Sequence, residues 1–139
     1  MPNPALELSP DDGLEPIRHA AAGCRACDLW RPSGKRRLHE RPNPAEVRAC
    51  RPWLDLELGL VSPAVVVALG ATAAAELFGL AFRLTKQRGV PQPAVDGRPV
   101  GLATFHPSAV LRARDEQART ATFEAVVRDL RTARMVATT

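Results

Sequence analysis

The feature that most constrains the fold is an apolar run with three consecutive valines, AVVVALG, which follows Pro63 and ends at Gly70. A run of this kind is typical of a strand buried on both faces, and such strands belong mainly to parallel sheets. Residues 71–78 are rich in alanine and predict a helix that ends at Gly79. Strand, tight turn and helix in succession indicate an α/β fold.

The remainder of this half of the chain predicts one more strand and a covering helix. Val100–Phe105 is expected to form a second short strand, after an irregular crossover over residues 83–98 that is rich in Gly and Pro. From about Asp115 to Arg134, apolar residues recur at helical spacing and predict an amphipathic helix that covers the sheet. The residues expected to face the sheet are Phe123, Val126, Val127 and Leu130.

Two helices are expected before the first strand. Leu14–Ala22 predicts a short helix with Gly23 as its stop. A longer helix is predicted from Pro44 toward Leu60, with Asn43 as its cap. Its internal proline, Pro52, is expected to kink it. The apolar side predicted for this helix consists of Val47, Cys50, Leu54 and Leu58.

Length and composition limit the classes of protein that fit. The 139 residues, 45% of them hydrophobic, predict a loose lead over residues 1–13 and a single domain over residues 14–139. We expect a cytoplasmic monomer that does not enter a membrane, because no apolar run is long enough and the start lacks a signal-peptide layout. The net charge of +4 favours an anionic partner, for which nucleic acid is a candidate.

Two groups of residues follow the predicted strands directly. Gly70 ends the first strand, and His106, Pro107 and Ser108 follow the second. The carboxyl ends of parallel strands share one edge of a sheet, where ligands bind in open α/β folds. His106 is well placed there to stabilise a developing anion, although it could instead cap the next helix.

A basic loop lies between the first two predicted helices. It contains Lys35, Arg36, Arg37, His39 and Arg41, bounded by a glycine and a proline. Lys and Arg contact phosphates without needing regular structure, so the loop is predicted to bind a nucleic-acid backbone. A solvated charge run is the alternative. The basic neighbours of His39 are expected to keep its imidazole neutral, and a neutral imidazole is a nucleophile.

The three cysteines could bind a metal. Cys24 and Cys27 form a C-x-x-C pair, and Cys50 lies in the first turns of the helix that begins at Pro44. In a reducing compartment, structural disulfides are not expected. Zinc sites and iron–sulfur clusters normally require four ligands, so the spacing leaves metal binding and simple burial open. His19 or His39 could complete a zinc site.

Several stretches of the sequence resemble the uracil-DNA glycosylase superfamily. They are CRACDLW, GKRRLHERPNPAEVRACRPWLDLELGLVSPAVVVALGATAA, RLTKQRG and ATFHPSAVLRA. The similarity is greatest to the iron–sulfur family 4 enzymes, and in particular to the UdgX branch that becomes covalently joined to DNA. The resemblance implies a three-layer α/β/α fold and a DNA-repair activity on uracil-containing DNA, presented as a single strand or as a flipped base.

The resemblance also implies roles for individual residues. Cys24, Cys27 and Cys50 match three ligands of a 4Fe–4S cluster. His39 matches the UdgX histidine that attacks the sugar carbon, and His106 matches the histidine that hydrogen-bonds the departing uracil. The residues that match contacts to the DNA backbone are Pro107, Ser108 and Arg112.

One departure from the family pattern affects all of these roles. Between Trp30 and Gly34, this chain lacks a long segment that carries the first two strands, the water-positioning motif, the aromatic residue that stacks on uracil and the asparagine that reads it. We therefore expect a reduced parallel sheet and a cluster with one ligand missing. Two alternatives to an active glycosylase are a catalytically inactive DNA-binding remnant and a small zinc-binding interaction module.

Overall fold

The computed structural model describes residues 2–31, 41–93 and 99–139. They form two compact units, Met1–Ser62 and Pro63–Thr139, which we call the first unit and the second unit. Each is described by itself. The compactness of each unit does not decide whether the two fold together, so the single domain over residues 14–139 stays a prediction.

The first unit is helical. Its elements are η1 (Pro4–Glu7), η2 (Pro10–Asp12), α1 (Leu14–Ala22), η3 (Asp28–Trp30) and α2 (Pro44–Val61). The helix predicted over Leu14–Ala22 is confirmed, and its last turn is closed by the backbone N–H of Gly23. Where the sequence predicts a loose lead, Asn3 and Ser9 cap two short 3-10 helices, and Ala5 packs with Ile17 and Leu56.

Helix α2 begins where the sequence predicts. The side chain of Asn43 accepts hydrogen bonds from the N–H groups of Ala45 and Glu46, and the Glu46 carboxylate accepts one from the N–H of Asn43. This reciprocal capping offsets the loss of helical partners in the first turn. The helix continues through Pro52 as one element.

The apolar face predicted for α2 is wrong in part. The buried residue is Leu56, with Trp53 and Leu60 packed around the same cluster, whereas Cys50 is exposed and Val47, Leu54 and Leu58 are half-buried. The face is set by the partners that α2 meets within its unit, which are α1 and the two short 3-10 helices before it.

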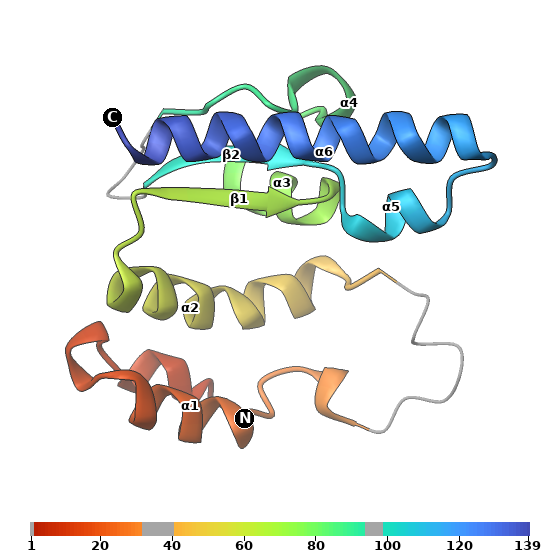
Figure 1. The fold of residues 1–139 in the computed structure, drawn as a ribbon. Coiled ribbons are helices and arrows are strands. Elements are labelled where there is room, and N and C mark those ends of the chain that lie inside the picture. The colour runs from red at the N-terminus through yellow and green to blue at the C-terminus, as the bar shows by residue number, and fades with distance from the viewer. Residues whose placement is uncertain (1, 32–40, 94–98) are drawn as a thin grey trace. The chain divides into compact units, whose positions relative to one another are not determined.

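The second unit is built on a two-stranded parallel sheet, as predicted. Its elements are β1 (Val65–Leu69), α3 (Ala71–Phe78), α4 (Leu84–Gln87), β2 (Val100–Thr104), α5 (Pro107–Leu111) and α6 (Glu116–Ala137). The strands pair in the register Val65↔Val100 to Leu69↔Thr104. Helix α6 runs along both strands, and α3 packs against β1 (Figure 1). The arrangement is an α/β fold with a reduced sheet.

The two strands are not equally buried, which corrects one prediction. The valine-rich strand β1 has only Ala68 buried, and Leu69 is 42% exposed, whereas Gly101–Thr104 of β2 are all buried. The ladder explains the difference: among the described residues β1 pairs only with β2, while β2 is also bridged to Gln92 at Gly101.

The face that α6 turns toward the sheet also differs from the prediction. Its buried residues are Ala125, Asp129 and Ala133, spaced four apart, while Phe123 and Leu130 are exposed. Small residues let the helix approach the strands closely, and the bulkier side chains lie outside that contact. Val126 and Val127, also predicted to face the sheet, are half-buried. The sequence pattern therefore predicts the helix correctly and its sheet-facing residues only in part.

A search of the described helices for a stretch with the length and hydropathy of a membrane span found none.

Candidate functional site

The turn after β1 and the turn after β2 meet at one edge of the sheet, as the sequence predicts. The N–H of Gly70 donates to the carbonyl oxygen of Thr104 at 2.9 Å. Gly70 has φ +90°, and a Cβ on it would lie 3.1 Å from the Cβ of His106. The positive φ favours glycine here, and a Cβ would also crowd the His106 side chain.

A chain of hydrogen bonds orients the His106 imidazole. Its Nδ1 accepts from the backbone N–H of Ser108 at 3.1 Å and lies 2.8 Å from the Ser108 Oγ. The Arg112 Nη2 donates to that Oγ at 2.9 Å. Because the arginine can only donate, the hydroxyl hydrogen of Ser108 is left to donate to Nδ1.

This arrangement selects one tautomer of the neutral ring. A backbone N–H can only donate, so Nδ1 must be the unprotonated nitrogen, and the proton of neutral His106 is on Nε2. His106 is exposed at the sheet edge. His106 does cap α5, as the sequence allowed, and it does so through Nδ1. Its Nε2–H therefore stays free to donate to a ligand oxygen.

The other predicted residues of this loop lie beside His106. Pro107 is the first residue of α5, where its fixed φ suits a helix start. Ser108 lies in the first turn of α5, and Arg112 is the residue that caps the C-terminal end of the same helix. Both are held toward His106 by the hydrogen bonds above, and contact of these three residues with DNA remains a prediction.

The three cysteines come from the C-x-x-C loop and from α2 within the first unit. The pKa of the Cys50 thiol is raised by the partial loss of its hydration, although the residue as a whole is exposed. The nearby Cys27, a hydrogen bond with it, and Cys24 and Glu46 raise this pKa further. The indole Nε1–H of Trp53 donates to the Cys24 Sγ at 3.3 Å. The thiols are thus close enough to influence one another, and α2 supplies both Cys50 and a hydrogen bond to Cys24.

The thiols fit a metal site in type but do not complete one. Within residues 2–31, 41–93 and 99–139, no group of three or more Cys, His, Asp or Glu residues is arranged to hold a metal ion. Three thiolates are one ligand short of the four that clusters and structural zinc require. His19, one of the two histidines considered for the fourth position, lies exposed on α1.

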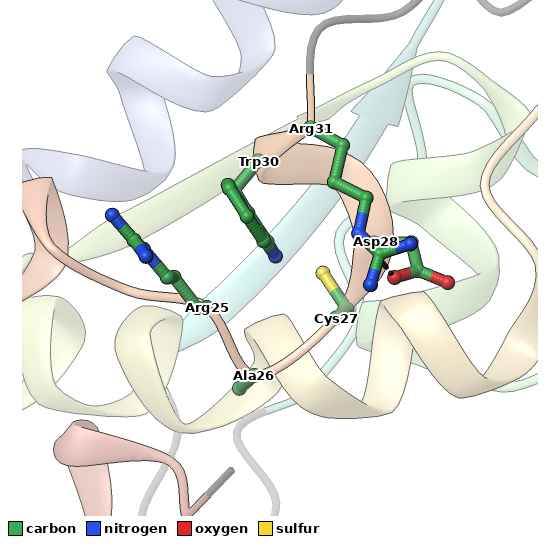
Figure 2. Close-up of a pocket in the computed structure, with 6 residues that line it drawn as sticks. All are labelled: Arg25, Ala26, Cys27, Asp28, Trp30 and Arg31. Atoms are coloured by element: carbon green, nitrogen blue, oxygen red, sulfur yellow. Dashed lines mark ion pairs between the residues drawn. The ribbon is translucent and has the colours of Figure 1, made fainter.

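A pocket of about 350 Å³ opens on the C-x-x-C loop. Its lining residues are Arg25, Ala26, Cys27, Asp28, Trp30 and Arg31 (Figure 2). The guanidinium carbons of Arg25 and Arg31 lie 4.6 and 5.6 Å from the centre of the Trp30 ring. Asp28 forms an ion pair with Arg31 at 3.2 Å. This cluster is not among the predicted sites, although the letters RACDLWR place two cations and an indole within seven residues.

Most of the predicted basic loop lies outside the described residues. Lys35, Arg36, Arg37 and His39 all fall in the range 32–40, so their predicted roles are not addressed by the structure. Arg41 is described and is exposed just before the Asn43 cap of α2.

Most of this chain is similar to known proteins. The family model described as the uracil DNA glycosylase superfamily matches residues 17–131. The Type-4 uracil-DNA glycosylase of Thermotoga maritima is 35% identical over 113 residues, which cover 70% of this chain and 58% of that protein. The Type-4 uracil-DNA glycosylase of Pyrobaculum aerophilum is 38% identical over 77 residues, which cover 51% and 39%. The matched part of each relative is less than two thirds of its length.

Proposed function

The chain belongs to the uracil-DNA glycosylase superfamily, with type-4 relatives, and from this premise we propose that it binds uracil-containing DNA and excises the uracil. The observation that carries the proposal is the hydrogen-bonded imidazole of His106 at the shared ends of β1 and β2. The resemblance of ATFHPSAVLRA to the family's motif supports the same role.

In the proposed reaction, His106 acts on the leaving group. The bond between the sugar carbon and the uracil nitrogen breaks, and its electron pair leaves with the base. The Nε2–H of His106 donates to the uracil oxygen on which negative charge develops, so the charge is stabilised without transfer of a proton. Ser108 and Arg112 hold the donor in place before the charge appears.

We propose that the sugar carbon is then captured by His39, as in the UdgX branch. The unprotonated nitrogen of its imidazole forms the new bond to carbon, and the ring afterwards loses its other proton to solvent. The cations expected to bind the DNA backbone next to this histidine are Lys35, Arg36, Arg37 and Arg41, together with the loop of Pro107, Ser108 and Arg112.

Location in the cytoplasm and a monomeric state remain predictions.

We also propose that Cys24, Cys27 and Cys50 hold an iron–sulfur cluster of the 4Fe–4S type, with a fourth ligand from outside the described residues. When bound, the cluster would stabilise the C-x-x-C loop against α2, and no step of the excision is assigned to it. Metal analysis tests this proposal. Iron with inorganic sulfide would support it, whereas one equivalent of zinc would favour the zinc-module alternative.

The excision proposal is tested by incubating the protein with a uracil-containing single-stranded oligonucleotide. We expect free uracil and a protein–DNA adduct that survives denaturant. His39→Ala should release uracil without the adduct, and His106→Ala should lose both. His19→Ala, at an exposed histidine of α1, is the matched control and should behave like the unmodified protein.

The same experiment identifies the inactive alternative. If the unmodified protein gives neither uracil nor adduct but still binds the oligonucleotide, then it is a DNA-binding remnant and the proposed activity is wrong. Binding that does not weaken with added salt would contradict the phosphate contacts, because such contacts release counterions.

A further inference from the structure

We propose that Asp129 is a positioning residue for His106. Its buried carboxylate fixes the last residue of β2 and, through Arg88, the residue that precedes the histidine. The proposal rests on the proposed function for its effect on the reaction. Its effect on the His106 ring can be measured separately.

Asp129 is a charged residue on the buried face of α6. It is 4% exposed, and Thr104 beside it is fully buried. Burial of a carboxylate is unfavourable unless hydrogen bonds and a counter-charge replace its hydration. A carboxylate kept at this position therefore requires partners that compensate it.

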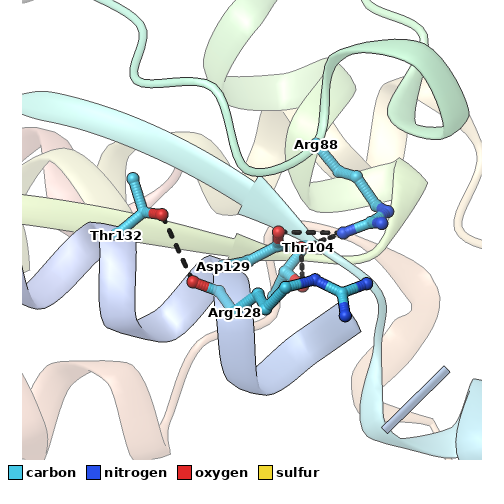
Figure 3. Close-up of polar contacts among 5 residues, drawn as sticks. All are labelled: Arg88, Thr104, Arg128, Asp129 and Thr132. Atoms are coloured by element: carbon cyan, nitrogen blue, oxygen red, sulfur yellow. Dashed lines mark hydrogen bonds and ion pairs between the residues drawn. The ribbon is translucent and has the colours of Figure 1, made fainter. Parts of the chain in front are cut away.

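Two side chains from different parts of the second unit satisfy this carboxylate. Arg88 Nη1 lies 2.8 Å from both oxygens of Asp129, and Thr104 Oγ1 donates to Oδ2 at 2.6 Å. Figure 3 shows the side chains of Arg88 and Thr104 both directed at the Asp129 carboxylate. The segment after α4, the end of β2 and the middle of α6 are thus joined at one group.

The residues held by this carboxylate lie directly before His106. Thr104 also accepts the N–H of Gly70 on its carbonyl oxygen, so its side chain and its backbone are both fixed. The guanidinium carbon of Arg88 lies 5.0 Å from the centre of the Phe105 ring, on the next residue. Asp129 therefore restrains Thr104 directly, and it restrains Phe105 through Arg88.

The backbone of the segment after α4 passes close to the Asp129 carboxylate. The N–H of Gly89 donates to the carbonyl oxygen of Ala103 at 2.8 Å, and a Cβ on Gly89 would collide with Asp129 Oδ1. Gly89 also has φ +71°, which favours glycine. The glycine therefore lets this segment lie close both to β2 and to the Asp129 carboxylate.

A small change in the exit direction of β2 would move the Nε2–H donor relative to the base. Misplacement of a catalytic group by about 1 Å can reduce a rate by about a hundredfold. Asp129 does not touch the substrate in this proposal and acts only through Thr104, Arg88 and Phe105.

The test measures the His106 ring and the reaction on the same proteins. Histidine nitrogens are labelled isotopically, and the His106 signals are assigned by their loss in His106→Gln. In the spectrum of the neutral ring, we expect the unmodified protein to show its proton on Nε2. Thr104→Val removes only the hydroxyl that donates to Asp129. Asp129→Asn removes the negative charge and leaves one oxygen, in place of two, to accept from Arg88 and Thr104.

Both variants should change the His106 nitrogen signals and lower kcat for uracil release by about tenfold or more, with KM little changed. Thr104→Ser restores the hydroxyl and should restore both readouts. Asp115→Ala is the matched control, because it removes a side chain that caps α6 without touching Thr104. It should destabilise the second unit and leave the His106 signals unchanged.

The outcomes separate this proposal from the proposed function. If folded Thr104→Val and Asp129→Asn proteins keep the His106 signals of the unmodified protein, the positioning role is wrong. If Asp129→Asn does not fold, the milder Thr104→Val decides the question. If the unmodified protein releases no uracil, the proposed function is wrong, and the nitrogen signals still decide whether Asp129 positions His106.

Discussion

The two units support their candidate residues in different ways. In the second unit, His106 is held by Ser108 and Arg112 at the end of a strand that is buried from Gly101 to Thr104. In the first unit, Cys50 is exposed on α2, and Cys24 receives one hydrogen bond, from Trp53. The residues that orient the His106 donor are thus all in place, whereas the three thiols lack the fourth ligand of a metal site.

This difference shows which kinds of site a fold with a reduced sheet can support. A hydrogen-bond donor needs only a few neighbours along the chain and a firm strand behind it. A four-ligand metal site needs groups from several segments of the chain. When one of those segments is lost, the remaining ligands no longer form a complete site. The comparison is testable because both tryptophans, Trp30 and Trp53, lie in the first unit. Their fluorescence reports unfolding of that unit, and circular dichroism reports both.

The largest effect is expected for Leu102→Ala. Leu102 is fully buried in β2, and its truncation should lower the free energy of unfolding by about 3 kcal/mol. In denaturant, the circular dichroism transition should move to lower concentration while tryptophan fluorescence changes less. Leu80→Ala, at a residue 88% exposed, is the control and should have no effect. Equal shifts in both signals would show that the units unfold as one.

Gly101→Ala should destabilise the second unit by about 2 kcal/mol. A Cβ at Gly101 would collide with the ring of Phe78, and overpacking of a close-packed core is unfavourable. Thermal unfolding followed by circular dichroism measures the loss. Adding Phe78→Leu should recover part of it, and a single variant as stable as the unmodified protein would contradict the packing described here.

Asn43→Ala should destabilise the first unit by about 1 kcal/mol. It removes the side chain that caps α2 at the N–H groups of Ala45 and Glu46. Tryptophan fluorescence in a urea titration should show the shift. Arg48→Ala, at an exposed position of the same helix, is the matched control. A shift seen only by circular dichroism would assign the loss of stability to the second unit and contradict the prediction.

The smallest effect is expected for Cys24→Ala when no metal is bound. The substitution removes one hydrogen bond, from the partly buried Trp53 indole, and should lower the free energy of unfolding by about 0.5 kcal/mol. Tryptophan fluorescence measures it. A loss several times larger, repeated in Cys27→Ala, would show that the thiols hold a metal that stabilises the first unit.

The sequence predicts the elements well because their signals are local. Gly23, Asn43, Gly70 and Gly79 mark helix ends through backbone conformation and capping, which depend on few neighbours. The same holds for His106, Pro107 and Ser108, whose contacts lie within one turn. Local chemistry therefore located the better-formed half of the candidate site.

The sequence predicts poorly what depends on distant partners. Asp129 reads as a solvent-facing residue of an amphipathic helix, and only Arg88 and Thr104, 41 and 25 positions away, make its burial favourable. The relative burial of β1 and β2 likewise depends on which strand has a neighbour at both edges. The roles of Lys35 to His39 stay predictions, because they lie outside the described residues.

Among the described residues, the hydrogen-bonded groups around His106 and the end of β2 come from residues 70–129. On the proposed function, the donor that assists departure of the base is thus encoded by a short stretch of sequence around β2 and α5. In evolutionary terms, selection on that stretch can differ from selection on the segments that read the base.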